Sequence, residues 1–149
     1  MSLRNWERSG WLVAHRASPE EIRDLFALVA RDLADSAAES LSPDWRMQIA
    51  YNAALQAATA ALAAAGYRAV REQHHHRVIH ALGMCTGLDP ELVQTLDAFR
   101  KKRNLSSYER SGIVSEAESR EMRRLAARVR REVVAWLRKE HPHLLRLLR

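Results

Sequence analysis

Residues 100 to 110 read RKKRNLSSYER, which sets four consecutive basic side chains before an amide, two hydroxyls and a phenol. Such groups can hold a phosphodiester, since a guanidinium donates paired hydrogen bonds to phosphate oxygens. Arg103, Asn104 and Tyr108 would form the centre of that site. The alternative is that Arg103 forms an ion pair inside the protein, Tyr108 packs in the core, and the other charges are solvated, as charge runs usually are.

A second group of side chains could do metal or proton chemistry. It consists of His74, His75, His76 and His80. His76 and His80 are four residues apart, so one helical face carries both and they could bind zinc. No Cys, Asp or Glu at matching spacing completes a site, although Glu72 and Cys85 are close in the sequence. We therefore predict no metal and no cofactor. A further alternative is that one of these histidines approaches Arg103 across the bundle or across a dimer and acts as a base.

The helices that would position these side chains have N-caps that can be recognised in the sequence. Ser18 and Ser115 each start an S-x-x-E capping box, while Ser42 and Asp89 each precede a proline. The predicted helices cover residues 18–37, 42–66 and about 70–86, followed by one from 89 and one from 115 to Pro142. Short connections between them favour antiparallel neighbours. The sequence therefore predicts an all-α, up-and-down bundle of about five helices.

The register of the helix that begins at Asp89 determines where the basic run points. Leu92, Leu96 and Phe99 recur at helical spacing, and four residues further lies Arg103. Arg103 should therefore face the core or an interface, where a charge needs a partner because leaving it unpaired costs several kcal/mol. Lys101 and Lys102 fall off this stripe.

The 149 residues are predicted to form one domain with two short appendages. Residues 1–17 are expected to be an N-terminal extension, 18–140 the bundle, and 141–149 a basic amphipathic tail that docks on the bundle or on a partner chain. Membrane binding by the tail is a minor alternative. A single cysteine, Cys85, expected to be a buried apolar residue, and the lack of a long apolar run favour a cytoplasmic protein without stable membrane association.

The net charge of +6 comes from one half of the chain. Residues 1–88 carry nine basic and nine acidic side chains, whereas residues 89–149 carry fifteen basic and nine acidic ones. A basic half suggests an anionic partner such as RNA, although solubility alone explains a cationic surface equally well. The candidate nucleic-acid-binding residues are Arg100, Lys101, Lys102, Arg123, Arg124 and Arg128.

The segment FRKKRNLSSYERSGIVSEAE, followed by a long basic helix, resembles the C-terminal half of HEPN (higher eukaryotes and prokaryotes nucleotide-binding) domains. LSPDWRMQIAYNAALQAATAALAAAGYR and QHHHRVIHALG resemble the two preceding helices of an uncharacterised bacterial branch, so the likeness spans about residues 18–138. It implies a small helical bundle, usually a homodimer that joins at the motif helices. Many members are metal-independent endoribonucleases, often toxins paired with a nucleotidyltransferase-like antitoxin.

The chain departs from the HEPN motif at one position. The motif is Arg, a polar residue, and a His four to six residues after the Arg; Arg103 and Asn104 match, but positions 108 to 110 are Tyr, Glu and Arg. Arg103 would stabilise the charge of a phosphorane and Asn104 would orient the phosphate. Tyr108, with an ordinary pKa near 10, replaces His poorly. Two functions stay open: an RNA-binding protein or endoribonuclease of toxin or defence type, and a non-catalytic dimeric interaction module.

Overall fold

The computed structural model describes residues 2–108 and 112–148, and for residues 106–108 it describes the backbone alone. Within these residues the chain forms six α-helices, two short strands and one 3-10 turn. The elements are α1 (Leu3–Arg8), β1 (Leu12–Ala14), α2 (Pro19–Asp35), α3 (Pro43–Ala64), β2 (Tyr67–Ala69), α4 (His74–Thr86), α5 (Pro90–Tyr108), α6 (Glu116–Glu140) and η1 (Pro142–Leu145). The predicted all-α class is confirmed.

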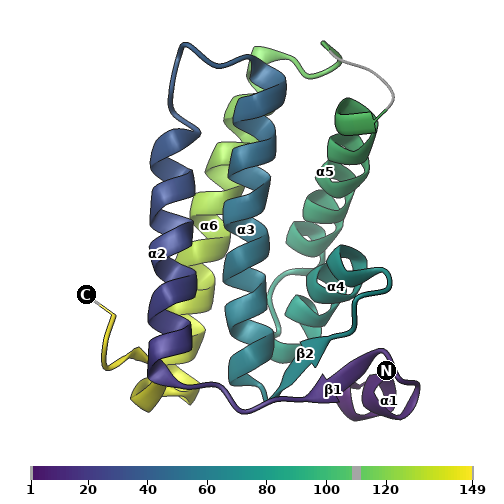
Figure 1. The fold of residues 1–149 in the computed structure, drawn as a ribbon, viewed down its shortest axis with the longest axis vertical. Coiled ribbons are helices and arrows are strands. Elements are labelled where there is room, and N and C mark those ends of the chain that lie inside the picture. The colour runs from purple at the N-terminus through teal and green to yellow at the C-terminus, as the bar shows by residue number, and fades with distance from the viewer. Residues whose placement is uncertain (1, 109–111, 149) are drawn as a thin grey trace.

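The long helices run alternately up and down (Figure 1). Helices α2 and α5 run in one direction and α3 and α6 in the other, while the shorter α4 lies between α3 and α5 near one end. Helix α3 occupies the centre, because it contacts α2, α4, α5 and α6. The predicted up-and-down bundle is therefore also confirmed, with α4 as its short member.

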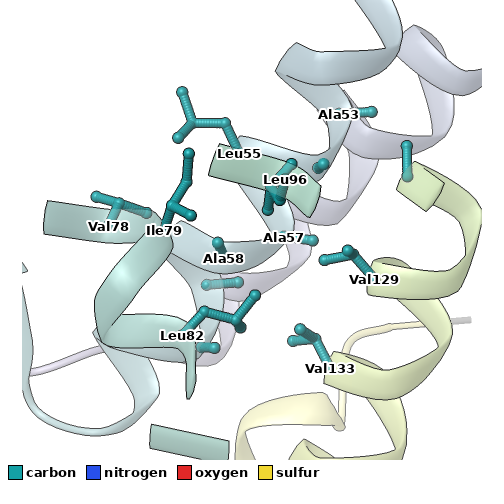
Figure 2. Close-up of a cluster of buried hydrophobic side chains, with 14 of the residues drawn as sticks. Ala53, Leu55, Ala57, Ala58, Val78, Ile79, Leu82, Leu96, Val129 and Val133 are labelled. Atoms are coloured by element: carbon teal, nitrogen blue, oxygen red, sulfur yellow. The ribbon is translucent and has the colours of Figure 1, made fainter. Parts of the chain in front are cut away.

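The central place of α3 follows from its alanines. The fully buried ones are Ala50, Ala53, Ala54, Ala57, Ala58, Ala60 and Ala61. Because an alanine side chain is a single methyl group, neighbouring helices can approach α3 closely on several sides at once. Ala57 and Ala58 lie among Leu82 of α4 and Val129 and Val133 of α6 (Figure 2). The core is thus built from larger side chains of the outer helices meeting small ones of α3.

The predicted helix starts agree with the structure. The side chains of Ser18, Ser42 and Ser115 accept hydrogen bonds from backbone N–H groups in the first turns of α2, α3 and α6. Ser115 forms the complete capping box, since the side chain of Glu118 accepts a hydrogen bond from the Ser115 N–H in return. The caps that were readable in the sequence therefore fix where these helices begin.

The start of α4 was predicted too early. Instead of continuing a helix from about residue 70, Tyr67–Ala69 forms strand β2, which pairs antiparallel with β1 in the register Leu12 to Ala69. Strand β2 contacts α3, and Leu12 of β1 is buried. Because residues 67–69 pair with β1, they are not part of the helix. Helix α4 begins at His74, after Gln73, whose backbone is left-handed with φ of 51°.

The N-terminal segment is attached to the bundle through aromatic contacts. Trp6 of α1 is buried and meets Trp11 edge to face, with ring centroids 5.5 Å apart. The guanidinium carbon of Arg77, on α4, lies 3.5 Å from the Trp11 centroid. A cation over an indole face is stabilised by the ring quadrupole. Residues 2–14 are therefore bound to α4 and to β2.

The C-terminal tail and one connection are also held by specific contacts. Leu144 of η1 is buried, and η1 contacts α2 and α6, which agrees with the expectation that the tail docks on the bundle. At the opposite end, the Asp44 carboxylate accepts hydrogen bonds from the N–H groups of Gly112 at 2.6 Å and Val114 at 3.2 Å. None of the described helices is long and apolar enough to cross a bilayer. The cytoplasmic location stays a prediction.

Candidate functional site

Arg103 faces α3, as its register predicted. Leu92, Leu96 and Phe99 are buried, and one turn later the guanidinium carbon of Arg103 lies 5.8 Å from the ring centroid of Tyr51. Among the described residues no carboxylate lies within ion-pairing distance of Arg103. Its partner inside the bundle is thus an aromatic face, which attracts the cation without neutralising it.

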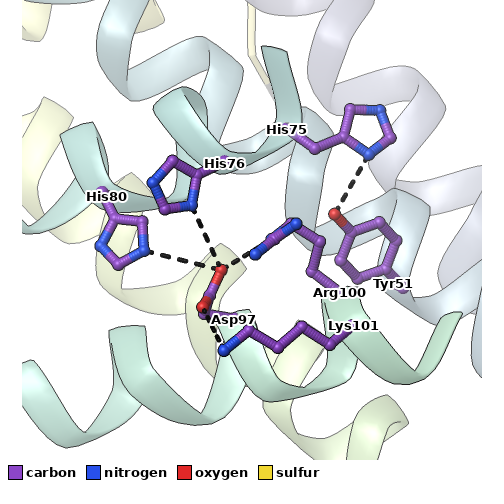
Figure 3. A network of polar contacts seen from close by, with 7 residues as sticks. All are labelled: Tyr51, His75, His76, His80, Asp97, Arg100 and Lys101. Carbon is purple, nitrogen blue, oxygen red and sulfur yellow. Dashed lines mark hydrogen bonds and ion pairs between the residues drawn. The ribbon is translucent and has the colours of Figure 1, made fainter. Parts of the chain in front are cut away.

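Tyr51 connects Arg103 to a histidine of α4. The Tyr51 hydroxyl lies 3.2 Å from Nδ1 of His75 (Figure 3). Burial raises the pKa of Tyr51 above its usual value even though Arg103 and Arg100 oppose the shift, so the phenol stays protonated. Burial, together with Arg103, His74 and Arg100, lowers the pKa of His75. A neutral imidazole, a phenol and a guanidinium therefore meet between α3, α4 and α5.

An open cleft of about 580 Å³ lies beside this group. Its lining comes from the start of α4 and from two successive turns of α5, and consists of Arg71, Gln73, His74, His75, His76, Arg100 and Asn104. Asn104, one of the residues singled out from the sequence, lies here next to Arg100. Among the residues that the structure describes, the lining holds two guanidinium groups and no carboxylate, although Arg100 also pairs with Asp97, and this balance favours an anion.

The first turn of α4 adds donors to the cleft wall. Gln73 precedes the helix without a capping hydrogen bond from its side chain. The first N–H groups of a helix have no partner within the helix and carry partial positive charge, so they favour a nearby anion. The start of α4 and Arg100 therefore favour the same charge in the cleft.

Asp97 organises a second cluster behind the cleft. Its Oδ1 accepts a hydrogen bond from Nε of Arg100 at 2.7 Å and lies 3.8 Å from Nδ1 of His76 and 3.6 Å from Nε2 of His80 (Figure 3). Burial tends to raise the pKa of Asp97, but the hydrogen bond and charge of Arg100, with His80 and Lys101, lower it overall. Burial, His80 and Arg100 lower the pKa of His76. Asp97 was not identified from the sequence.

The spacing of residues in the sequence predicted two members of this cluster, His76 and His80, but not the third. His76 and His80 do share one face of α4, as their separation predicted, with ring centroids 4.4 Å apart. The third member lies on α5, seventeen residues beyond His80 in the sequence. Which turn of α5 packs against which turn of α4 is a tertiary property, so matching by sequence spacing missed Asp97.

The other predicted nucleic-acid-binding residues lie away from the cleft. Lys101 is exposed and reaches Asp97, whereas Nζ of Lys102 turns toward α6 and lies 2.5 Å from Oε2 of Glu118. Arg124 and Arg128 line a groove between α5 and α6 that also contains Asp89, Glu91 and Glu121. Arg123 is half-buried on α6. Of the six predicted nucleic-acid-binding residues, Arg100 therefore lines the cleft, Arg124 and Arg128 line the groove of mixed charge, and Lys101, Lys102 and Arg123 line neither.

Tyr108 cannot be placed in either region. Helix α5 extends to Tyr108, but the side chain lies outside the described residues. In the described part of the chain, Arg103 and His75 of α4 contact the same side chain, Tyr51. Whether a histidine acts as a base beside Arg103 stays a prediction.

Cys85 is expected to be chemically inert in the folded protein. Burial raises the pKa of its thiol to about 12, so the thiolate forms only at strongly alkaline pH. Because the thiolate is the nucleophile, alkylation by iodoacetamide at pH 8 should be on the order of a thousandfold slower in the native protein than in urea. Mass spectrometry of timed samples measures both rates. The side chain of Cys85 is half-buried, less than the full burial predicted from the sequence. Equal rates would contradict the raised pKa of the thiol.

Comparisons of the chain with protein-family models, curated proteins and solved structures found no match. The HEPN resemblance therefore rests on the sequence segments that suggested it.

Proposed function

We propose that this protein is a HEPN-like RNA-binding protein whose cleft between α4 and α5 holds the phosphate backbone. The observation that carries the proposal is the convergence of Arg71, Arg100 and Asn104 with the uncapped start of α4 around one open cleft. Guanidinium groups, an amide and helix N–H groups are the donors that contact phosphate in nucleic-acid complexes. The described lining of the cleft contains no carboxylate, whereas that of the groove along α6 contains three.

The same site supports metal-independent cleavage of RNA as the catalytic form of this function. In that reaction the ribose 2′-OH gives its proton to a base and attacks the adjacent phosphorus, which forms a 2′,3′-cyclic phosphate. The 5′ oxygen of the next nucleotide leaves and takes up a proton. Arg103 would stabilise the charge that develops on the phosphoryl oxygens, and Asn104 would orient them. His75 of α4 would supply the imidazole that position 108 lacks. Its contact with Tyr51, which also lies against Arg103, would hold that imidazole in position.

A non-catalytic interaction module is the second candidate. Two observations favour it: the motif position is Tyr108, and Arg103 is half-buried against Tyr51. Leu105, one residue after Asn104, is 43% exposed and offers an apolar contact for a second copy or for a nucleotidyltransferase-like partner. In this form the protein would be a homodimer that joins through α5, and sedimentation at micromolar concentration would give twice the chain mass.

RNA binding is tested best by two pairs of substitutions that remove equal charge. Arg71→Gln with Arg100→Gln changes the cleft, and Arg124→Gln with Arg128→Gln changes the α6 groove. Fluorescence anisotropy with single-stranded RNA should show about tenfold or greater weakening for the cleft pair, and a salt dependence whose slope falls by about two. The groove pair should change affinity much less.

Three results would contradict the cleft. Equal losses from both pairs would mean that binding depends on overall charge. A larger loss from the groove pair would move the interface to α6. No measurable affinity of the wild-type protein for RNA, combined with a dimeric mass, would favour the interaction module.

A further inference from the structure

Three potential metal ligands converge where α4 packs against α5. One ring nitrogen of His76, one of His80 and a carboxylate oxygen of Asp97 all lie within 4.8 Å of one another. The two imidazoles occupy successive turns of α4 and the carboxylate approaches from α5 (Figure 3). From this geometry we propose that His76, His80 and Asp97 bind one divalent transition-metal ion, with zinc as the best match.

The spacing of the three atoms suits zinc. Zinc lies about 2.0 to 2.2 Å from nitrogen and oxygen ligands, so two ligands of a tetrahedral ion are separated by roughly 3.4 Å. The Asp97 oxygen lies 3.8 Å from Nδ1 of His76 and 3.6 Å from Nε2 of His80. These two distances need to shorten by only a few tenths of an ångström, and the ligand nitrogens of His76 and His80 lie within 4.8 Å of each other, a gap that rotation of the imidazoles would close. Two imidazoles and one carboxylate form a donor set that is common at zinc.

The hydrogen bonding of the cluster points to a ligand as well. Nε2 of His80 is buried and has no hydrogen-bond partner among the described residues. Buried polar atoms are normally satisfied, because leaving one unpaired is unfavourable. The distance of 3.6 Å to Asp97 is too long for a hydrogen bond, whereas an ion between the two atoms would satisfy both.

Arg100 and Lys101 would affect both the orientation of the Asp97 carboxylate and the affinity of the site for a cation. Arg100 donates to the same Asp97 oxygen at 2.7 Å, and Lys101 lies 3.7 Å from the other oxygen. A hydrogen bond from outside orients a ligating carboxylate, as partners of metal ligands generally do. Two nearby cations also oppose a doubly charged ion, so removing the charge of exposed Lys101 should strengthen binding. Because His76 also lines the cleft, the fourth position of the ion would face it.

Zinc binding by the full chain tests this site independently of RNA. Titration of zinc chloride against a competing chromogenic chelator should give one ion per chain, and zinc should raise the thermal midpoint of unfolding because it binds only the folded cluster. His76→Gln with His80→Gln should lower the affinity by at least about a hundredfold, because loss of even an outer partner of a metal ligand costs about ten- to a hundredfold. Asp97→Asn should also weaken binding, whereas Lys101→Ala should strengthen it.

The matched control is His74→Gln with His75→Gln, which removes two histidines from the same helix. This pair should retain one-to-one binding and the rise in thermal midpoint. Circular dichroism of each variant without zinc establishes that it is folded. The site is refuted if the wild-type protein binds no zinc at this stoichiometry, or if both histidine pairs lose affinity equally. RNA binding by the cleft would survive that result.

Discussion

Replacing Arg103 by Ala is expected to lower RNA cleavage on the order of a hundred- to a thousandfold, equivalent to about 3 to 4 kcal/mol of transition-state stabilisation. The reason is that the guanidinium of Arg103 lies against Tyr51, which in turn contacts His75. Cleavage should proceed in EDTA, because the 2′-OH is the nucleophile. The measurement is single-turnover cleavage of a labelled RNA at neutral pH with and without EDTA.

Graded variants separate the role of Arg103 in the reaction from its role in packing. Arg103→Lys keeps the charge but loses the paired donors, so it should retain more activity than Arg103→Ala. Asn104→Ala should cost less than Arg103→Ala, because a neutral amide stabilises charge more weakly than a guanidinium. Tyr51→Phe keeps the ring under Arg103 and removes the hydroxyl beside His75. If Arg103→Ala cleaves as fast as the wild type, the activity lies elsewhere or in a contaminant.

Tyr108→His provides the test of a lost active site. This substitution restores the HEPN acid–base group at the expected spacing and should raise activity near neutral pH if the surrounding geometry is suitable. Cleavage by this variant alone would mean that the wild-type site has lost its chemistry. If both proteins are inactive and still dimerise, the interaction module is the better description.

Replacing Ala57 by Leu is expected to destabilise the fold by about 2 kcal/mol or more, since overpacking a closely packed core usually costs about 1 to 3 kcal/mol. Ala57 is fully buried among side chains of α6 and of the other helices around α3 (Figure 2). Urea unfolding followed by circular dichroism measures the change as a lower midpoint at unchanged slope.

Ala27→Leu is the matched control for this prediction. Ala27 is an exposed alanine in the middle of α2, and both residues are good helix formers, so the substitution should change stability by less than about 0.5 kcal/mol. If the two variants unfold at the same urea concentration, α3 does not pack as closely as its buried alanines indicate.

The parts of the fold that depend on local chemistry were predictable. Ser18, Ser42 and Ser115 begin helices because their side chains pair with N–H groups only three residues away. The buried face of α5 was predictable because it repeats within one helix. Strands β1 and β2 were missed, since three residues are too few to show an alternating pattern and their pairing joins segments over fifty residues apart.

Residues of the candidate site could be predicted from the sequence only where they lie together on one helix. Asn104 and Arg103 were identified from α5 alone, whereas the approach of His75 to Tyr51 and of Asp97 to His80 depends on how α4 packs against its neighbours. The charge count of the C-terminal half was a weaker guide. The count treats Lys102 as a free cation, but Lys102 donates a hydrogen bond to Glu118 of α6. That hydrogen bond also lowers the pKa of Glu118.

The buried alanines of α3 also bear on how this sequence can change over evolutionary time. A larger residue at Ala57 or Ala58 collides with the surrounding helices, and glycine in a helix interior costs about 1 kcal/mol relative to alanine. Each such position therefore tolerates few alternatives. The half-exposed histidines of α4 are under no comparable steric limit. The alanine-rich part of α3 should therefore change more slowly in sequence than the rest of the chain. The histidines of α4 should be retained only while a function selects for them.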